Sequence, residues 1–361
     1  MRPTVAVVVE HAWHRVPGGT ATAVDATLDA LVELDEVDLV GLAAAHRSTP
    51  VPPPPIEARG SFLPRGLLYE AWHRLGFPRS GSQADLIWAP AMAVPPASKP
   101  LVVTVHDVDF LEHPERLSRR GASFFPRAWK AAVERADRIV VPSTVVASKI
   151  TERGVESHRV TVVPWGVDSA TAAPGAIERI DAKLPEQFVL WVGTAEPRKN
   201  LGGLVEAMQS PPLAGVPLVV VGPAGWGIDR DATLAPLRER VILLGHLDRA
   251  DLLAVYARAT VFAFPSFDEG FGLPVLEAMA QGTAVVTSAG TATEEVAGGA
   301  AALVDPRDAA GIGSAIAELY HDPDARGAAV AAGRARVAEA TWERTALGYE
   351  SVFLDLVGVE R

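Results

Sequence analysis

Short apolar runs alternate with longer amphipathic stretches from one end of this chain to the other. The short runs are typical of strands buried on both faces, and the stretches between them carry the 3.6-residue period of helices. This alternation favours parallel sheets that are covered by helices. The expected strands form two sets, 4–9, 37–42, 85–88, 101–105, 138–141 and 160–163, then 188–192, 217–221, 241–244, 261–264, 284–287 and 302–304. We therefore expect an α/β protein with two doubly wound, Rossmann-like domains.

A change of composition near residue 169 separates the two sets. The segment 169–186 is rich in Ala, Thr and Pro, and the next apolar run begins at Phe188. We expect an N-terminal domain over 1–168, a linker over 169–186 and a second domain over 187–340. The tail, 341–361, has the pattern of a last amphipathic helix. The four consecutive prolines at 52–55 predict a stiff surface loop, because proline cannot join the interior of a sheet.

The overall composition excludes several classes of protein. No apolar run approaches the roughly 18 residues of a membrane-spanning helix. The first residues lead directly into an expected strand, so we expect no secretory signal. The chain has no cysteine, which rules out disulfides and thiolate metal sites. These features predict a cytoplasmic protein, and the net charge of −11 argues against a nucleic-acid partner.

The charge is unevenly distributed along the chain. Almost all of the net negative charge lies in 169–361, so a phosphorylated ligand bound there needs a few placed cations and backbone amides. The segment 116–138 is instead rich in Lys and Arg, interleaved with Phe124, Phe125 and Trp129. Two interpretations stay open. The segment could make a weak peripheral contact with the inner face of a membrane, or form a solvated helix face with a buried aromatic side.

The clearest site signal is a glycine-rich turn between the strand 261–264 and the next helix. Its glycines permit a close approach of the backbone to a ligand, and Pro274 suits the start of a helix. Unpaired amides at a helix N-terminus form an anion site that suits phosphate. The residues expected to form this site are Gly270, Phe271, Gly272 and Leu273.

Two glutamates flank this turn. Glu269 lies in the loop and Glu277 near the start of the helix. A carboxylate can accept two neighbouring hydroxyl protons, as a ribose diol or a sugar ring presents them. The alternative is that Glu277 complements the helix dipole and Glu269 is a solvated loop residue. The glycine context favours the binding role.

Adjacent cations follow the first strand of the second set, in the sequence 196–200. Arg198 and Lys199 lie in a short turn, and Asn200 can cap the helix that follows. A guanidinium fork and a compact ammonium both suit a diphosphate, and they stabilise charge on a departing phosphate. The alternative is a surface turn with solvated charges.

Weaker candidates follow other expected strands. His106 can donate a hydrogen bond to a sugar or phosphate oxygen. Gly18 and Gly19 open a helix, but their turn does not match G-x-G-x-x-G, so a nicotinamide cofactor and dehydrogenase chemistry are not indicated. Ordinary strand-end turns are the alternative for the remaining candidates, which could hold a nucleotide base: Gly222, His246 and Leu247.

With these residues in view, the chain resembles the family-4 (group 1) glycosyltransferases, in which two Rossmann-like domains face each other across a cleft in the GT-B fold. The resemblance rests on the spacing of Glu269 and Glu277, the turn 270–274 and the sequence 196–200. The segments 106–107, 112–114 and 136–140 also match. The resemblance covers nearly the whole chain and is most specific over 188–305.

The resemblance implies a retaining transferase that needs neither metal nor cofactor. It would move a hexose, with mannose from GDP-mannose as the first expectation, from a nucleotide-diphosphate sugar to a hydroxyl of a glycan or a lipid-linked acceptor. Cell-envelope or polysaccharide biosynthesis is the implied setting. A nucleotide-sugar epimerase of the same fold and a non-catalytic nucleotide-sugar-binding protein are the alternatives.

The resemblance also implies a role for each candidate residue. Arg198 and Lys199 would grip the donor diphosphate, with the amides of 271–273 assisting. Glu277 would bind the ribose hydroxyls, Glu269 the hydroxyls of the transferred sugar, and His106 the donor sugar or phosphate. Gly18 and Gly19 would line the cleft, and the last helix would cross back onto the N-terminal domain. The domain 1–168 would be the acceptor side, and the domain 187–340 would bind the nucleotide-sugar.

Overall fold

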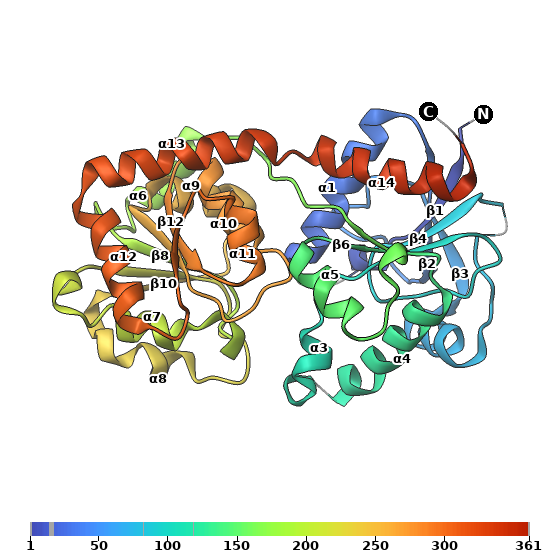
Figure 1. Cartoon of the computed structure of the whole chain (residues 1–361), viewed down its shortest axis with the longest axis horizontal. Helices are drawn as coiled ribbons and strands as arrows, with labels where there is room; N and C mark the ends of the chain where they lie inside the picture. Colours follow the sequence, from blue (N-terminus) through green and yellow to red (C-terminus); the bar gives the residue numbers. More distant parts are fainter. Residues whose placement is uncertain (1, 14–17, 82, 118, 360–361) are drawn as a thin grey trace. The chain divides into compact units, whose positions relative to one another are not determined.

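A computed structural model describes residues 2–13, 18–81, 83–117 and 119–359 (Figure 1). The chain divides into two compact units, and each is described here by itself. Unit 1 comprises Met1–Gly166 and Trp342–Arg361, and unit 2 comprises Val167–Thr341. The segment 169–186, expected as a linker, belongs to unit 2. There helix α6 (Pro174–Asp181) packs against helix α9 (Arg249–Arg258).

The described part of unit 1 contains a seven-stranded parallel sheet in the order β3-β2-β1-β4-β5-β6-β7. Each strand pairs with its neighbours in parallel, with Val5 of β1 opposite Leu39 of β2 and Leu86 of β4. The strands are β1 (Thr4–Val8), β2 (Asp38–Ala45), β3 (Ala58–Pro64), β4 (Leu86–Ala89), β5 (Leu101–Thr104), β6 (Arg138–Val141) and β7 (Val160–Val162).

Alternate residues of these strands bury against opposite faces of the sheet. In β1, Val5 and Val7 join one core, which α1 (Gly19–Leu34) and α14 (Trp342–Val357) cover. Ala6 and Val8 join the other core, to which α2 (Arg65–Glu70), α4 (Arg119–Arg135) and α5 (Thr144–Thr151) contribute. Because both faces are covered, the strands read as continuous apolar runs in the sequence.

Helix α4 carries the basic segment singled out in the sequence. Phe124, Phe125 and Trp129 are partly buried and pack against the core, whereas Arg119 and Arg120 are exposed. Helix α4 therefore has a solvated basic face and a partly buried aromatic side, which is the second of the two interpretations of this segment. Among the residues that the structure describes, no helix combines the length and the apolar character needed to cross a bilayer.

Unit 2 is built in the same way around a six-stranded parallel sheet in the order β10-β9-β8-β11-β12-β13. Its strands are β8 (Val189–Val192), β9 (Leu218–Val221), β10 (Val241–Gly245), β11 (Val261–Phe264), β12 (Ala284–Ser288) and β13 (Ala302–Val304). Besides α6 and α9, its helices are α7 (Leu201–Ala207), α8 (Arg230–Leu234), α10 (Leu273–Ala280), α11 (Ala292–Ala297), α12 (Ala309–His321) and α13 (Pro323–Glu339). The predicted fold class, two doubly wound parallel-sheet domains, is confirmed.

One strand, β3, is missing from the sequence prediction. It is an edge strand whose one partner among the described strands is β2, and none of its residues is fully buried. Its sequence, ARGSFLP, carries neither the apolar run of a central strand nor a clean alternation. The expected strands all occur, with ends that differ by up to three residues.

In each sheet the order of the strands along the chain reverses at one point. In unit 1 the order reverses between β1 and β4, and in unit 2 it reverses between β8 and β11. Ligands of open parallel sheets bind outside the carboxyl ends of the strands at such a switch point. We therefore expect ligand-binding residues in the loops that follow β1, β4, β8 and β11.

Helix α14 carries part of the core of unit 1. Phe353 is fully buried, with its ring centroid 5.6 Å from that of Trp88 in β4. The indole of Trp88 donates to the hydroxyl of Thr104 at 3.0 Å, and that hydroxyl lies 3.0 Å from the hydroxyl of Tyr349. The last helix is thus joined to two central strands.

Replacing Phe353 with Ala should lower the free energy of unfolding by about 3–5 kcal/mol, because it leaves a cavity between α14 and the sheet. Urea titration of the full chain followed by near-ultraviolet circular dichroism measures this. The control is Phe62→Ala, since Phe62 is 71% exposed in the same unit. Equal effects of the two substitutions would contradict the packing of α14.

Candidate functional site

Two cations meet one carboxylate at the carboxyl ends of β8 and β11. Arg198 and Lys199 lie in the short helix η5 (Pro197–Lys199) after β8, and Glu269 lies in the loop after β11. Arg198 Nη1 donates to Glu269 Oε2 at 2.8 Å, and Lys199 Nζ donates to Glu269 Oε1 at 2.8 Å. Arg198 Nη2 also donates to Glu196 Oε1 at 3.0 Å. The residues predicted to bind a diphosphate are thus brought together at the switch point of unit 2.

Asn200 fixes the two loops against each other. It has a left-handed backbone, with φ of 53°, and its side-chain oxygen accepts from the amide of Gly203 at the start of α7. Its side-chain amide donates to the carbonyl of Pro265 at 2.9 Å, in the loop after β11. The amide of Phe267 donates in turn to the carbonyl of Arg198 at 2.8 Å. The predicted helix cap therefore also positions the cations.

Burial and charge act in opposite directions on Glu269, which is 8% exposed. Burial by itself raises the pKa of this carboxyl, but the charges of Arg198 and Lys199 outweigh it, so the pKa lies below its usual value. The ammonium of Lys199 also lies 4.8 Å from the ring centroid of Phe264. A Cβ at Gly193 would come within 2.7 Å of the Lys199 side chain, so a glycine there leaves room for the cation.

The turn at the start of α10, where the sequence predicts an anion site, requires a glycine. Gly272 caps the helix with φ of +104°, and a Cβ at this position would lie 2.6 Å from the methyl of Thr293. Only glycine fits both conditions. Helix α10 begins at Leu273, so Pro274 is its second residue and Glu277 lies in its second turn.

Glu277 has two partners that the sequence analysis missed. One carboxylate oxygen pairs with Arg249, and the other accepts from the hydroxyl of Tyr256 at 3.1 Å. Burial and the charge of Glu277 raise the pKa of Tyr256, so the phenol keeps its proton and donates. Arg249 opens α9 two residues after the turn that holds His246 and Leu247, which is the signal that could have identified it.

Gly222 lies where the turns after three strands meet. Its amide donates to the carbonyl of Gly245 at 2.7 Å, directly before His246. A Cβ at Gly222 would lie 2.0 Å from the carbonyl oxygen of Gly193, so the turns after β8 and β9 are in contact. The weaker candidates of unit 2, Gly222, His246 and Leu247, thus lie at the carboxyl ends of the strands, as Lys199 does.

Three predicted residues, His106, Gly18 and Gly19, belong to unit 1. His106 Nε2 donates to the carbonyl of Pro90 at 2.6 Å, and burial lowers the pKa of His106 to about 4, so the ring is neutral at neutral pH. Gly18 caps α1, and open space lies beside both glycines. Val16 and Pro17 of the same turn lie outside the described residues.

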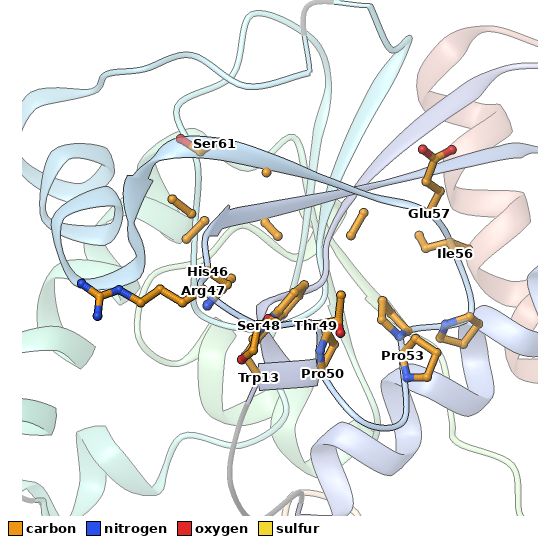
Figure 2. Close-up of a pocket in the computed structure, with 17 residues that line it drawn as sticks. Trp13, His46, Arg47, Ser48, Thr49, Pro50, Pro53, Ile56, Glu57 and Ser61 are labelled. Atoms are coloured by element: carbon orange, nitrogen blue, oxygen red, sulfur yellow. The ribbon is translucent and has the colours of Figure 1, made fainter.

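Unit 1 also has an open groove of about 790 Å³ beside the proline-rich segment. Figure 2 shows Trp13 and His46 toward one end of it, and Ile56 and Glu57 toward the other. The Trp13 and His46 rings stack, with centroids 4.2 Å apart and planes 9° apart. The Trp13 indole donates to the carbonyl of Ser48 at 2.9 Å, which ties the segment to the loop after β1.

Two doubly wound parallel-sheet units, one with paired cations and a glycine-capped helix N-terminus at its switch point, define the fold class as GT-B. Comparison with known proteins agrees. Residues 176–336 match the model of "Glycosyl transferases group 1", and residues 17–171 match that of "Glycosyltransferase Family 4". The chain belongs to the family-4, group 1 glycosyltransferases.

Individual relatives match much of the chain. O-antigen chain mannosyltransferase B of Escherichia coli is 31% identical over 304 residues, covering 78% of this chain and 79% of that protein. D-inositol 3-phosphate glycosyltransferase of Salinispora arenicola (strain CNS-205) is 34% identical over 254 residues, covering 62% and 56%. The crystal structure of Anabaena Alr3699/HepE in complex with UDP-glucose shares the fold, with a TM-score of 0.73, 20% identity, and coverage of 98% of this chain and 100% of that one.

Glu269→Gln should lower the free energy of unfolding at neutral pH by about 3 kcal/mol, because it leaves two largely buried cations without their charged partner. The folded-state pKa of Glu269 lies below the usual 4.5. Its contribution is therefore complete above that value and is lost as the pH falls through the folded pKa.

The difference in stability between wild type and Glu269→Gln should thus stay constant from neutral pH to about pH 5 and shrink below it. Thermal unfolding across this range measures it, with Glu186→Gln as the control because Glu186 is an exposed carboxylate of unit 2. A difference that does not change with pH would contradict the ion pairs.

Proposed function

We propose that this glycosyltransferase is a retaining mannosyltransferase that uses GDP-mannose. The acceptor is a hydroxyl of a glycan or lipid-linked glycan in the synthesis of a cell-envelope polysaccharide such as O-antigen. Mannose and O-antigen are suggested by the Escherichia coli relative, whose name states both. The observation that carries the proposal is the pairing of Arg198 and Lys199 on the two oxygens of Glu269.

This pairing holds two cations ready for a diphosphate. Glu269 and Glu196 balance the charges of Arg198 and Lys199, so the cations stay in place although they are mostly buried. An ammonium has three N–H donors, so Lys199 can donate to a phosphate oxygen while it keeps its hydrogen bond to Glu269. A diphosphate at the N-terminus of α10 would gain the helix dipole as well as both cations.

The two glutamates suit the hydroxyls of the donor. Glu269 is ionised at neutral pH and can accept protons from the hydroxyls of the transferred sugar. Arg249 and Tyr256 orient the two oxygens of Glu277, and each oxygen has a second lone pair. Such a carboxylate can take both hydroxyls of a ribose diol.

The proposed reaction is a front-face substitution. The bond between the sugar's anomeric carbon and the phosphate oxygen breaks, and the nucleoside diphosphate leaves with the electron pair. The acceptor oxygen forms its bond on the same face, and its proton passes to the leaving phosphate oxygen. Arg198, Lys199 and the α10 amides stabilise the charge on the phosphate, so no metal is needed in this scheme. His106 contributes a contact to donor sugar or phosphate.

A thermal-shift panel tests the donor. GDP-mannose should raise the melting temperature more than UDP-glucose, dTDP-rhamnose or ADP-glucose at equal concentration, because stabilisation grows with concentration over Kd. Lys199→Ala should abolish most of this shift and lower kcat by about 10²-fold. Lys183→Ala is the matched control, since Lys183 is exposed in unit 2. A larger shift with another donor would reject GDP-mannose, and full turnover by Lys199→Ala would reject the diphosphate site.

The stereochemistry of the product tests the reaction itself. With the α-linked donor GDP-mannose, the front-face route should give an α-mannoside, which the one-bond carbon–proton coupling at the anomeric centre identifies by NMR. Activity should persist in EDTA. A β-mannoside would overturn the proposed route, and conversion of the nucleotide-sugar without an acceptor would indicate an epimerase.

A further inference from the structure

A buried hydroxyl lies beside the carboxylate that pairs with the two cations of unit 2. Ser266 is in the loop after β11, shortly before Glu269, and it is fully buried. Its Oγ makes no hydrogen bond to any residue that the structure describes. Burial and the two cations act most strongly on the pKa of Glu269, but the Ser266 hydroxyl is close enough to lower it as well. The site thus contains a donor next to Glu269 that is not engaged in a regular hydrogen bond.

The backbone at this hydroxyl is fixed by two other elements. The carbonyl of Ser266 accepts from the hydroxyl of Ser288 at 2.6 Å, at the end of β12. The amide of the next residue, Phe267, donates to the carbonyl of Arg198 at 2.8 Å, in η5. Because two consecutive residues are held in this way, the side chain of Ser266 stays close to Glu269.

An unpaired hydroxyl in this position does not stabilise the arrangement described. Buried polar groups in folded proteins generally have a hydrogen-bond partner, and burying one without a partner lowers stability. An alanine in place of Ser266 would avoid that loss. The hydroxyl therefore points to a use in a different arrangement of Glu269.

The donor complex of the proposed function supplies such an arrangement. There the diphosphate draws Arg198 and Lys199 and brings its own negative charge close to Glu269. Both changes disfavour the ionised carboxyl and would raise its pKa. A protonated Glu269 accepts fewer hydrogen bonds and presents a donor to the sugar hydroxyls. Another hydrogen-bond donor is then needed to keep the carboxylate charged.

The charged groups around Glu269 come from η5 and from its own loop. Arg198 and Lys199 face it from η5, and Glu196 pairs with Arg198. Asp268 precedes it, and the carbonyl of Asp268 accepts from Arg198 at 3.2 Å. Ser266 adds a neutral donor to this set. Since the hydroxyl is buried and uncharged, it stays with the carboxylate when the cations turn to a phosphate.

We propose that Ser266 is a positioning residue for sugar transfer. Its hydroxyl donates to Glu269 once a diphosphate has drawn Arg198 and Lys199, and it keeps the carboxylate charged and directed at the hydroxyls of the transferred sugar. The inference rests on the proposed function and adds a residue to it. Ser266 acts only through Glu269, so every effect of its substitution depends on that carboxylate.

Ser266→Ala separates this role from a structural one. The melting temperature of the full chain without added nucleotide should equal or exceed that of wild type, because no hydrogen bond is lost. With saturating GDP-mannose, kcat should fall about 10-fold. The acid limb of the kcat profile should move to higher pH, because the Glu269 carboxyl loses a donor that favours its charged form.

Ser210→Ala is the matched control. The Oγ of Ser210 is also buried without a partner among the described residues of unit 2, and it lies beside Gly313 of α12. This substitution should leave kcat and its pH profile unchanged. A lower melting temperature for Ser266→Ala, together with a kcat profile in its wild-type place, would show a purely structural role and overturn the proposal.

Binding of GDP tests the same step without turnover. Ser266→Ala should weaken GDP binding about 3- to 10-fold in isothermal titration calorimetry, because the diphosphate then repels a carboxylate without a compensating donor. Ser266→Cys has a similar size but a weak S–H donor, and should lie between serine and alanine. In the Glu269→Gln background there is no charge to stabilise, so Ser266→Ala should change the GDP affinity much less. Equal effects in both backgrounds would overturn the proposal.

Failure of this role is distinguishable from failure of the proposed function. If Ser266→Ala binds GDP and transfers mannose as wild type does, the proposed function stands and the role of Ser266 is rejected. If wild type binds no nucleotide of the donor panel, the proposed function is rejected and the role of Ser266 with it. A coupling between Ser266 and Glu269 that appears with UDP in place of GDP would reject GDP-mannose and support the role of Ser266.

Discussion

All described strands in both sheets run parallel, and this constraint decides where chemistry can occur. In a parallel sheet the carboxyl ends of the strands share one edge, and the connections leave in opposite directions on either side of the switch point. The loops after β8 and β11 therefore diverge next to each other, and they supply Arg198, Lys199 and Glu269. Unit 1 obeys the same rule, since the loops after β1 and β5 supply His11 and His106 to one cavity.

Under the proposed function, Glu269 has two tasks. In the structure described here it holds two largely buried cations, which would otherwise be destabilising. In the proposed reaction the donor diphosphate would take over that role and leave the carboxylate to the sugar hydroxyls. Because Glu269 already holds both cations in place, little reorganisation would be required as charge develops on the leaving phosphate.

The sequence predicts the fold and the turns that carry the candidate site, because both depend on local patterns. Apolar runs identify the buried strands, and glycines next to charges identify the strand-end turns. The edge strand β3 has no such pattern, because its side chains are at most partly buried. Helix α6 was assigned to the linker because its composition is that of a loop, although it packs on α9. Arg249 and Tyr256 are partners of Glu277 only through the crossing of α9 and α10, which no spacing in the sequence encodes. The same holds for His11 and Asp25, whose contact depends on where α1 turns back over the sheet.

The two units differ in the charges at the carboxyl ends of their strands. In unit 2 the loops after β8 and β11 bring Arg198 and Lys199 together on Glu269, whereas the described residues that line the cavity at the switch point of unit 1 include no Lys or Arg. Under the proposed function, the charge that develops on the leaving phosphate would therefore be stabilised by unit 2.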